Sequence, residues 1–264
     1  MSPMMAALLD AVKRVARIEV MPRYLKVAQE RKSDGSLFTE ADLAAQNRLG
    51  LELKQIADCP MLGEEMSESL QHELWSSATE GLWCVDPIDG TTNFINGIPY
   101  FGISVAFMRQ GRPVLGVVFD PVADEAFYAE ANSGAYLNGV PLPIKESRPD
   151  SLASSVAEVD LKRLSSRLGE ALGRNPPYTS QRNFGASSLD WCYIAAGRFD
   201  LYLHGGQKLW DYAAGALILQ EAGGKMSTQE QDDFWAANVW TRSVIAALDE
   251  NLFREWRKWI RAHQ

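Results

Sequence analysis

The chain has 264 residues, of which 46% are hydrophobic and 23% are charged, and its formal net charge at pH 7 is −8. This composition is ordinary for a globular protein and excludes disordered and collagen-like classes. The acidic balance disfavours nucleic acids and anionic membranes as partners, and no apolar run approaches the roughly 18 residues of a membrane helix.

The cysteines and histidines exclude a disulfide framework and a zinc site. Cys59, Cys84 and Cys192 are odd in number and far apart, which favours a reducing, cytoplasmic location. The N-terminus lacks the basic region of a signal peptide. The three histidines are equally dispersed. Any bound metal therefore needs mostly oxygen ligands, as Mg²⁺, Mn²⁺ or Ca²⁺ do.

The first half of the chain predicts two helices followed by strands. Apolar residues recur at helical spacing over 4–29, and the segment 31–38 has the composition of a loop. A second helix is expected over 39–57, with Asp42 completing a capping box at its start. The apolar run 82–85 is typical of a buried strand, and a loop follows it directly. Three further runs, separated by Gly and Pro turns, predict an antiparallel meander: 102–110, 114–120 and 125–131.

The second half of the chain alternates short strands with helices, and the polar stretch 141–151 separates it from the first half. We therefore expect two halves, 1–145 and 146–264, packed as one compact unit. A meander joined to an alternating half predicts a layered α/β protein. The expected strands are 154–159, 200–204 and 244–248. The expected helices are 161–172, 187–196, 210–222 and 251–262.

The most informative stretch is DPIDGT at 86–91. Its two carboxylates follow the buried strand, and Gly90 permits a close approach or a positive φ. The backbone N–H groups of Gly90, Thr91 and Thr92 can point at one spot and bind an anion. A turn with a helix cap uses the same residue types. However, five specified positions in D-P-x-D-G-T arise by chance in only about one chain in ten thousand, at ~5% usage per residue.

The charges around this stretch indicate a metal site. No Lys, Arg or His occurs between Leu82 and Met108, and like charges 4 Å apart repel by about 4 kcal/mol at an effective dielectric of 20. Carboxylates that face a phosphate therefore require divalent cations. Further ligands are expected from one residue of the pair Glu64-Glu65, because successive side chains of an extended segment point opposite ways, and from Asp211. Singly, a glutamate pair is typical of a solvated surface and Asp211 of a helix cap.

Three motifs in this order resemble the inositol monophosphatase family, which belongs to a lithium-sensitive, Mg²⁺-dependent phosphatase superfamily. They are GEE (63–65), DPIDGTTNF (86–94) and WDYAAGALILQEAGG (210–224). Segments 32–42 and 184–200 are also similar to the family, so the resemblance covers nearly the whole chain. It implies an αβαβα sandwich, a homodimer, and two or three Mg²⁺ ions as cofactors.

The resemblance also implies roles for individual residues. Thr91 and Glu64 correspond to the pair that orients and activates the attacking water, and Asp89 belongs to the same catalytic set. Lys32 and Asp42 correspond to a more mobile segment that closes on the site. The implied metal ligands are Glu64, Asp86, the carbonyl of Ile88, Asp89 and Asp211. The implied substrate contacts are Asp89, Gly90, Thr91, Gly185, Ala186, Ser187, His204 and Asp211.

His204 departs from the family, since many members have a glutamate there that binds substrate hydroxyls. The histidine favours weaker contact with inositol hydroxyls, or a substrate with its own carboxylate, second phosphate or other acceptor. An equally open interpretation is that its side chain points elsewhere.

The residues and the resemblance together predict a Mg²⁺-dependent phosphomonoesterase for a small polyol or sugar phosphate, most simply myo-inositol 1-phosphate. Direct attack by water is favoured, because no Ser–His or Cys–His pair is apparent. Histidinol-phosphate phosphatases share DGTTNF, whereas nucleotide 3′-phosphatases typically carry DGTKEF. Fructose-1,6-bisphosphatase is a further alternative in the superfamily. A non-catalytic regulatory protein with this fold is an alternative of another class, although a scaffold needs no converging carboxylates.

Overall fold

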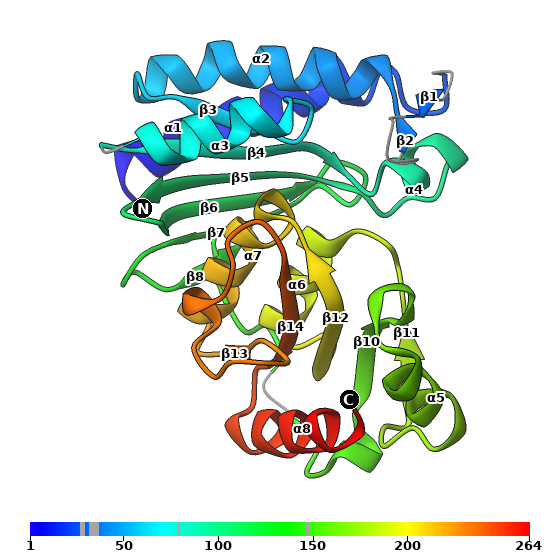
Figure 1. Cartoon of the computed structure of the whole chain (residues 1–264). Helices are drawn as coiled ribbons and strands as arrows, with labels where there is room; N and C mark the ends of the chain where they lie inside the picture. Colours follow the sequence, from blue (N-terminus) through cyan, green and yellow to red (C-terminus); the bar gives the residue numbers. More distant parts are fainter. Residues whose placement is uncertain (27–29, 32–36, 79, 146–147) are drawn as a thin grey trace.

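The computed structural model describes residues 1–26, 30–31, 37–78, 80–145 and 148–264. The chain forms five layers, in which helices alternate with two β-sheets (Figure 1). This confirms the predicted layered α/β class and the αβαβα sandwich. No helix in the described part of the chain is long and apolar enough to cross a bilayer.

The first helical layer consists of α1 (Pro3–Val15), its π-helical continuation η1 (Ala16–Val20), α2 (Glu40–Ile56) and α3 (Glu68–Ser77). The helix predicted over 4–29 ends early. Pro22 lacks the N–H that would continue the ladder, and turns follow η1. The predicted loop 31–38 carries the short paired strands β1 (Glu30–Arg31) and β2 (Leu37–Phe38).

The larger sheet has seven strands in the order β3 to β9. Strand β3 runs parallel to β4, and the strands from β4 onward form the predicted antiparallel meander. The helix α3 and the last two strands were not predicted. The strands are β3 (Met61–Gly63), β4 (Leu82–Asp89), β5 (Gly102–Arg109), β6 (Arg112–Asp120), β7 (Glu125–Glu130), β8 (Ala135–Leu137) and β9 (Val140–Pro141), and the six-residue α4 (Thr91–Asn96) follows β4.

The smaller sheet has the order β11-β10-β12-β14-β13, with β10 parallel to both of its neighbours. Its strands all follow residue 155, so the proposed division at 145/146 falls between the two sheets. The strands are β10 (Val156–Asp160), β11 (Ser180–Arg182), β12 (Leu201–Gln207), β13 (Lys225–Ser227) and β14 (Arg242–Ala247). The 3₁₀ turns are η2 (Leu152–Ser154), η3 (Leu161–Arg163) and η4 (Phe234–Ala236).

Two helices, α6 (Ser187–Ala195) and α7 (Leu209–Glu221), lie between the sheets (Figure 1). Strand β12 shows how this arrangement buries a strand on both faces. Leu201 and Leu203 pack toward the outer helices, whereas Tyr202 belongs to the core around α6 and α7. Helix α7 approaches β6 closely at Gly116, where a Cβ would lie 3.0 Å from the carbonyl oxygen of Ala214.

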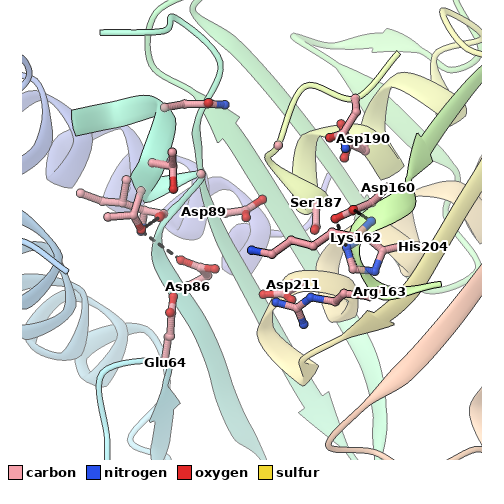
Figure 2. A pocket seen from close by; sticks show the side chains of 17 residues that line it. Glu64, Asp86, Asp89, Asp160, Lys162, Arg163, Ser187, Asp190, His204 and Asp211 are labelled. Atoms are coloured by element: carbon pink, nitrogen blue, oxygen red, sulfur yellow. Dashed lines mark hydrogen bonds and ion pairs between the residues drawn. The ribbon is translucent and has the colours of Figure 1, made fainter. Parts of the chain in front are cut away.

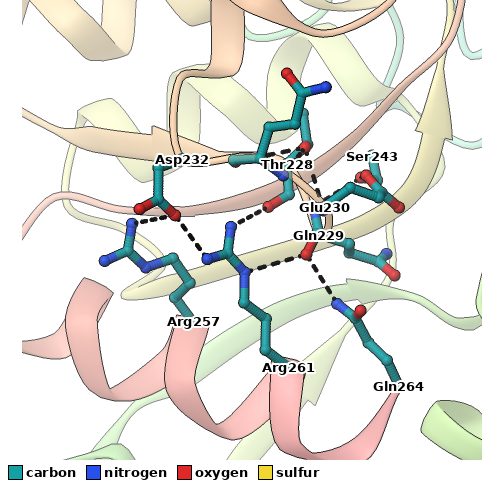
Figure 3. Close-up of polar contacts among 9 residues, drawn as sticks. Thr228, Gln229, Glu230, Asp232, Ser243, Arg257, Arg261 and Gln264 are labelled. Carbon is teal, nitrogen blue, oxygen red and sulfur yellow. Dashed lines mark hydrogen bonds and ion pairs between the residues drawn. The ribbon is translucent and has the colours of Figure 1, made fainter.

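The last layer contains α5 (Ser166–Arg174) and α8 (Glu250–His263). The predicted helix 161–172 is in fact η3 followed by α5, because the Ser165 side chain accepts from the N–H of Leu168 and starts a new helix. Polar contacts connect α8 to the loop that follows β13 (Figure 3). Arg257 and Arg261 both contact Asp232, at 3.0 and 2.6 Å, so these basic side chains link α8 to that loop.

Candidate active site

A β-bulge places the two motif aspartates on the same side of β4. Asp86 pairs with Ser104 and Asp89 with Gly102, so three steps along β4 match two along β5. In a regular strand, side chains three residues apart point to opposite faces of the sheet. The extra residue of the bulge turns Asp86 and Asp89 to the same face. Pro87 lies inside the bulge, where its missing N–H costs no ladder hydrogen bond. The local sequence thus directs both carboxylates into one cavity.

Gly90 connects β4 to α4 with a φ of +88°. A Cβ there would lie 3.0 Å from the Cβ of Ala186 and 3.2 Å from the carbonyl oxygen of Tyr100, so only glycine fits without movement. Ala186 is fully buried beneath this turn. Its side chain therefore supports the loop, and Ala186 is not among the residues that line the cavity.

Asp211 enters the same cavity from the first turn of α7. One of its oxygens accepts from the N–H of Lys208 at 2.9 Å, so the helix-capping interpretation is also correct. Asp86, Asp89 and Asp211 each offer a carboxylate oxygen within 4.8 Å of the other two. Of the glutamate pair, Glu64 lines the cavity, whereas the backbone N–H of Glu65 donates to Gln46.

The cavity has a volume of about 620 Å³ and lies between the carboxyl end of β4 and the smaller sheet (Figure 2). Gly185, Ser187 and His204 line it as well. Six of the described lining residues are acids and two are permanent cations, which leaves an excess of four acids. The acids are Glu64, Asp86, Asp89, Asp160, Asp190 and Asp211, and the cations are Lys162 and Arg163.

Burial and mutual repulsion oppose ionisation of the central carboxylates. Burial raises the pKa of Asp86 well above its usual range, and the charges of Glu64, Asp89 and Asp211 raise it further. Burial raises the pKa of Asp89 to about 6, although hydrogen bonds from Ser188 lower it in part. The pKa of Asp211 is raised by the same two causes. Such a cluster is stabilised by bound cations.

Ser188 is a supporting residue that the sequence analysis missed. Its backbone N–H and its hydroxyl both donate to Oδ2 of Asp89, each at 2.6 Å. Asp160, Lys162, Arg163 and Asp190 were missed as well. The signal for them was weak, because Asp160, Lys162 and Arg163 join the cavity only through the pairing of β10 with β12, and Asp190 only through the placement of α6.

Of the two residues assigned to the mobile segment, Lys32 and Asp42, the structure describes Asp42. Asp42 is fully buried at the start of α2, where its Oδ2 accepts from the N–H and hydroxyl of Thr39 at 2.8 and 2.6 Å. This confirms the capping box, and Asp42 still acts on the site by raising the pKa of Asp86. Lys32 lies outside the described residues.

Cys84 and Cys192 are buried in the core, and burial raises the pKa of both thiols. A protonated, enclosed thiol is a poor nucleophile. These cysteines therefore offer no route to a covalent intermediate.

Comparison with known proteins identifies the family. The model of the inositol monophosphatase family matches residues 1–260. The chain belongs to this family. Because its members are phosphatases, membership identifies the protein as a phosphatase.

Individual relatives are similar over most of their length. An inositol monophosphatase of Mesembryanthemum crystallinum is 34% identical, with 89% of this chain and 88% of that protein covered. The protein named Nus factor SuhB of Pseudomonas aeruginosa is 32% identical, with 86% of each covered. The crystal structure of the extragenic suppressor protein suhB from Bartonella henselae superposes with a TM-score of 0.85 at 29% identity, covering 98% of this chain and 99% of that one.

Proposed function

We propose that the protein is a Mg²⁺-dependent phosphomonoesterase that hydrolyses a small polyol or sugar phosphate by direct attack of water. The observation that carries this proposal is the convergence of Asp86, Asp89 and Asp211, whose oxygens lie within 4.8 Å of one another inside a strongly acidic cavity. A cavity of about 620 Å³ also has the size of a small-molecule site.

The donor set fits magnesium. Carboxylate and carbonyl oxygens are the ligands that this hard cation prefers. Burial and mutual repulsion raise the pKa values of the aspartates, and a bound cation would offset both. When bound, Mg²⁺ lowers the pKa of water and neutralises charge on the phosphoryl and leaving oxygens. The residues proposed to hold two or three ions are Glu64, Asp86, the carbonyl of Ile88, Asp89 and Asp211.

Thr91 and Glu64 are proposed to orient the attacking water. The Thr91 hydroxyl donates to the carbonyl of Ile88 at 3.1 Å, which leaves its oxygen as an acceptor. A water that donates its protons to Thr91 and Glu64 has its remaining lone pairs directed elsewhere, toward the phosphorus. Water held in this way attacks the phosphorus directly, so that no phosphoenzyme is formed.

The same loop is proposed to hold the phosphoryl group, through the backbone N–H groups of Gly90 and Thr91. Gly185 and Ser187, on the opposite wall, are proposed to contact the alcohol part of the substrate. His204 lines the cavity too, but its Nε2 lies 3.2 Å from Asp160 and its Nδ1 accepts from the N–H of Gly206. Its contact with substrate would therefore be through the ring and not through a free nitrogen.

The simplest substrate is myo-inositol 1-phosphate. Histidinol phosphate is the less favoured alternative, since its amine would meet Lys162 and Arg163 in the cavity. A homodimer and a cytoplasmic location are proposed on the family resemblance and the scattered cysteines.

A phosphate-release screen of the purified protein with Mg²⁺ tests this function. The panel contains inositol phosphates, histidinol phosphate, fructose 1,6-bisphosphate and a nucleotide 3′,5′-bisphosphate. We expect release from small polyol or sugar phosphates, inhibited by millimolar lithium. Release from none of them would contradict the proposal and favour the non-catalytic alternative.

A further inference from the structure

Two cations reach into the cavity from the smaller sheet. Lys162 and Arg163 belong to η3, directly after β10, and both line the cavity. Figure 2 shows them extending toward the side that carries Asp86, Asp89 and Asp211. None of the ion pairs in the described part of the chain includes either residue. The function proposed above uses these two charges only to disfavour a substrate that carries an amine.

The turn that carries the two cations is fixed to β12. The Nε2 of His204 lies 3.2 Å from Asp160, and the N–H of Gly206 donates to Nδ1 of His204 at 3.1 Å, so the neutral ring donates to Asp160. Asp160 in turn accepts from the N–H of Lys162 at 2.8 Å. His204 therefore holds the residue that caps η3.

Arg163 is anchored separately. Its Nη1 donates to the carbonyl of Gly206 at 2.9 Å. Its backbone packs so closely on Gly205 that a Cβ at that position would collide with the Arg163 carbonyl group. Three consecutive residues of β12, His204 to Gly206, thus fix the position of η3.

Asp160 and Asp190, two further acids of the cavity, already have hydrogen-bond donors. The hydrogen bond from His204 holds the pKa of Asp160 below its usual range, and this carboxylate is occupied by His204 and the N–H of Lys162. Asp190 accepts from the hydroxyl of Tyr100 at 2.9 Å, and burial raises its pKa. Cations bound at the central carboxylates would repel Lys162 and Arg163. Lys162 and Arg163 are themselves exposed on the cavity wall, so an anionic group that enters the cavity can reach both.

We infer that Lys162 and Arg163 form a subsite for a second anionic group on the alcohol part of the substrate, either a carboxylate or a second phosphate. This inference rests on the proposed phosphatase function. Ammonium and guanidinium groups only donate hydrogen bonds, so they match an anion better than the hydroxyls of a neutral polyol. Substrate specificity is then determined by an anionic substituent on the alcohol part of the substrate, and not by the phosphoryl group that is cleaved.

Matched substrate pairs test the subsite. Glycerol 3-phosphate and 3-phosphoglycerate share a three-carbon skeleton and differ by a carboxylate, whereas fructose 6-phosphate and fructose 1,6-bisphosphate differ by a phosphate. For the protein with Mg²⁺, we expect a higher kcat/KM for the anionic member of at least one pair. The pair that shows the preference identifies the second anion as carboxylate or phosphate.

Variants then assign the preference to residues. The preference is the kcat/KM of the anionic member of a pair divided by that of the neutral member. Lys162→Gln and Arg163→Gln should each lower this ratio about tenfold, as expected for the loss of one charged hydrogen bond. Lys258→Gln removes the same charge from the exposed face of α8 and should leave the ratio unchanged. An equal loss for all four substrates would overturn the inference and place the cations on the transferring phosphoryl group. An unchanged ratio, or no preference at all, would also overturn it. No release from any substrate would overturn the phosphatase proposal and the subsite together.

Discussion

An Asp89→Asn variant is expected to lose turnover by about 10³-fold or more, while its metal-free fold becomes more stable. Asp89 is only 9% exposed, and burial raises its pKa from 3.8 to about 6. Two pKa units correspond to about 3 kcal/mol of unfavourable interaction for the ionised form. The amide keeps an acceptor oxygen for Ser188, whose two hydrogen bonds hold the native side chain. Removing the charge therefore relieves the cost of burying it, and some repulsion, without loosening the loop.

The pH dependence of this stabilisation follows from the direction of the shift. Since the carboxyl has a higher pKa in the folded protein, the fold binds more protons than the unfolded chain between about pH 4 and pH 6. The Asp89 contribution to the free energy of unfolding is fully present at low pH and is lost as pH rises through about 6. Thermal denaturation without metal should show a larger gain for Asp89→Asn at pH 7.5 than at pH 5.

The matched control is Asp58→Asn, at an exposed residue that forms an ion pair with Lys54 at 3.8 Å. Exposed pairs of this kind contribute little, so both melting temperature and turnover should stay near those of the native protein. Near-normal kcat in Asp89→Asn would show that the loop 86–91 is structural and not catalytic.

A Thr91→Val variant is expected to lower kcat by about 10²- to 10⁴-fold while KM changes little. Valine keeps the branched shape at the start of α4 but lacks the hydroxyl that donates to Ile88 at 3.1 Å. The acceptor that we propose for orienting the attacking water is lost with the hydroxyl. Steady-state kinetics, on a substrate that the phosphate-release screen identifies, measures the separate effects on kcat and KM.

Thr91→Ser provides the matching rescue, because it retains the hydroxyl and removes only a methyl group. Its kcat should lie within about tenfold of the native value. If valine and serine lowered kcat equally, packing of α4 and not the hydroxyl would explain the loss, and water orientation by Thr91 would be wrong.

The parts of the site that lie close together in sequence could be predicted. The motif 86–91 carries its own turn and its glycine at positive φ, because these depend on neighbouring residues. The capping box of Thr39 and Asp42 is local in the same way. The three long strands of the meander are marked by β-branched and aromatic residues between Gly and Pro turns.

Other parts depend on long-range contacts and could not be predicted. Lys162 and Arg163 enter the cavity because β10 pairs with β12, which begins some forty residues later. Helix α3 was missed because Gln71 is its only buried residue, so it lacks an apolar stripe. The burial of Ala186 follows from the approach of α6 to Gly90, which neither segment reveals alone.

The most direct measurement of the central claim is phosphate release from myo-inositol 1-phosphate by metal-free protein titrated with Mg²⁺. The carboxylate cluster of Asp86, Asp89 and Asp211 predicts no release in the presence of a chelator and saturable release as Mg²⁺ is added. Full release from the exhaustively chelated protein would contradict a metal-dependent site.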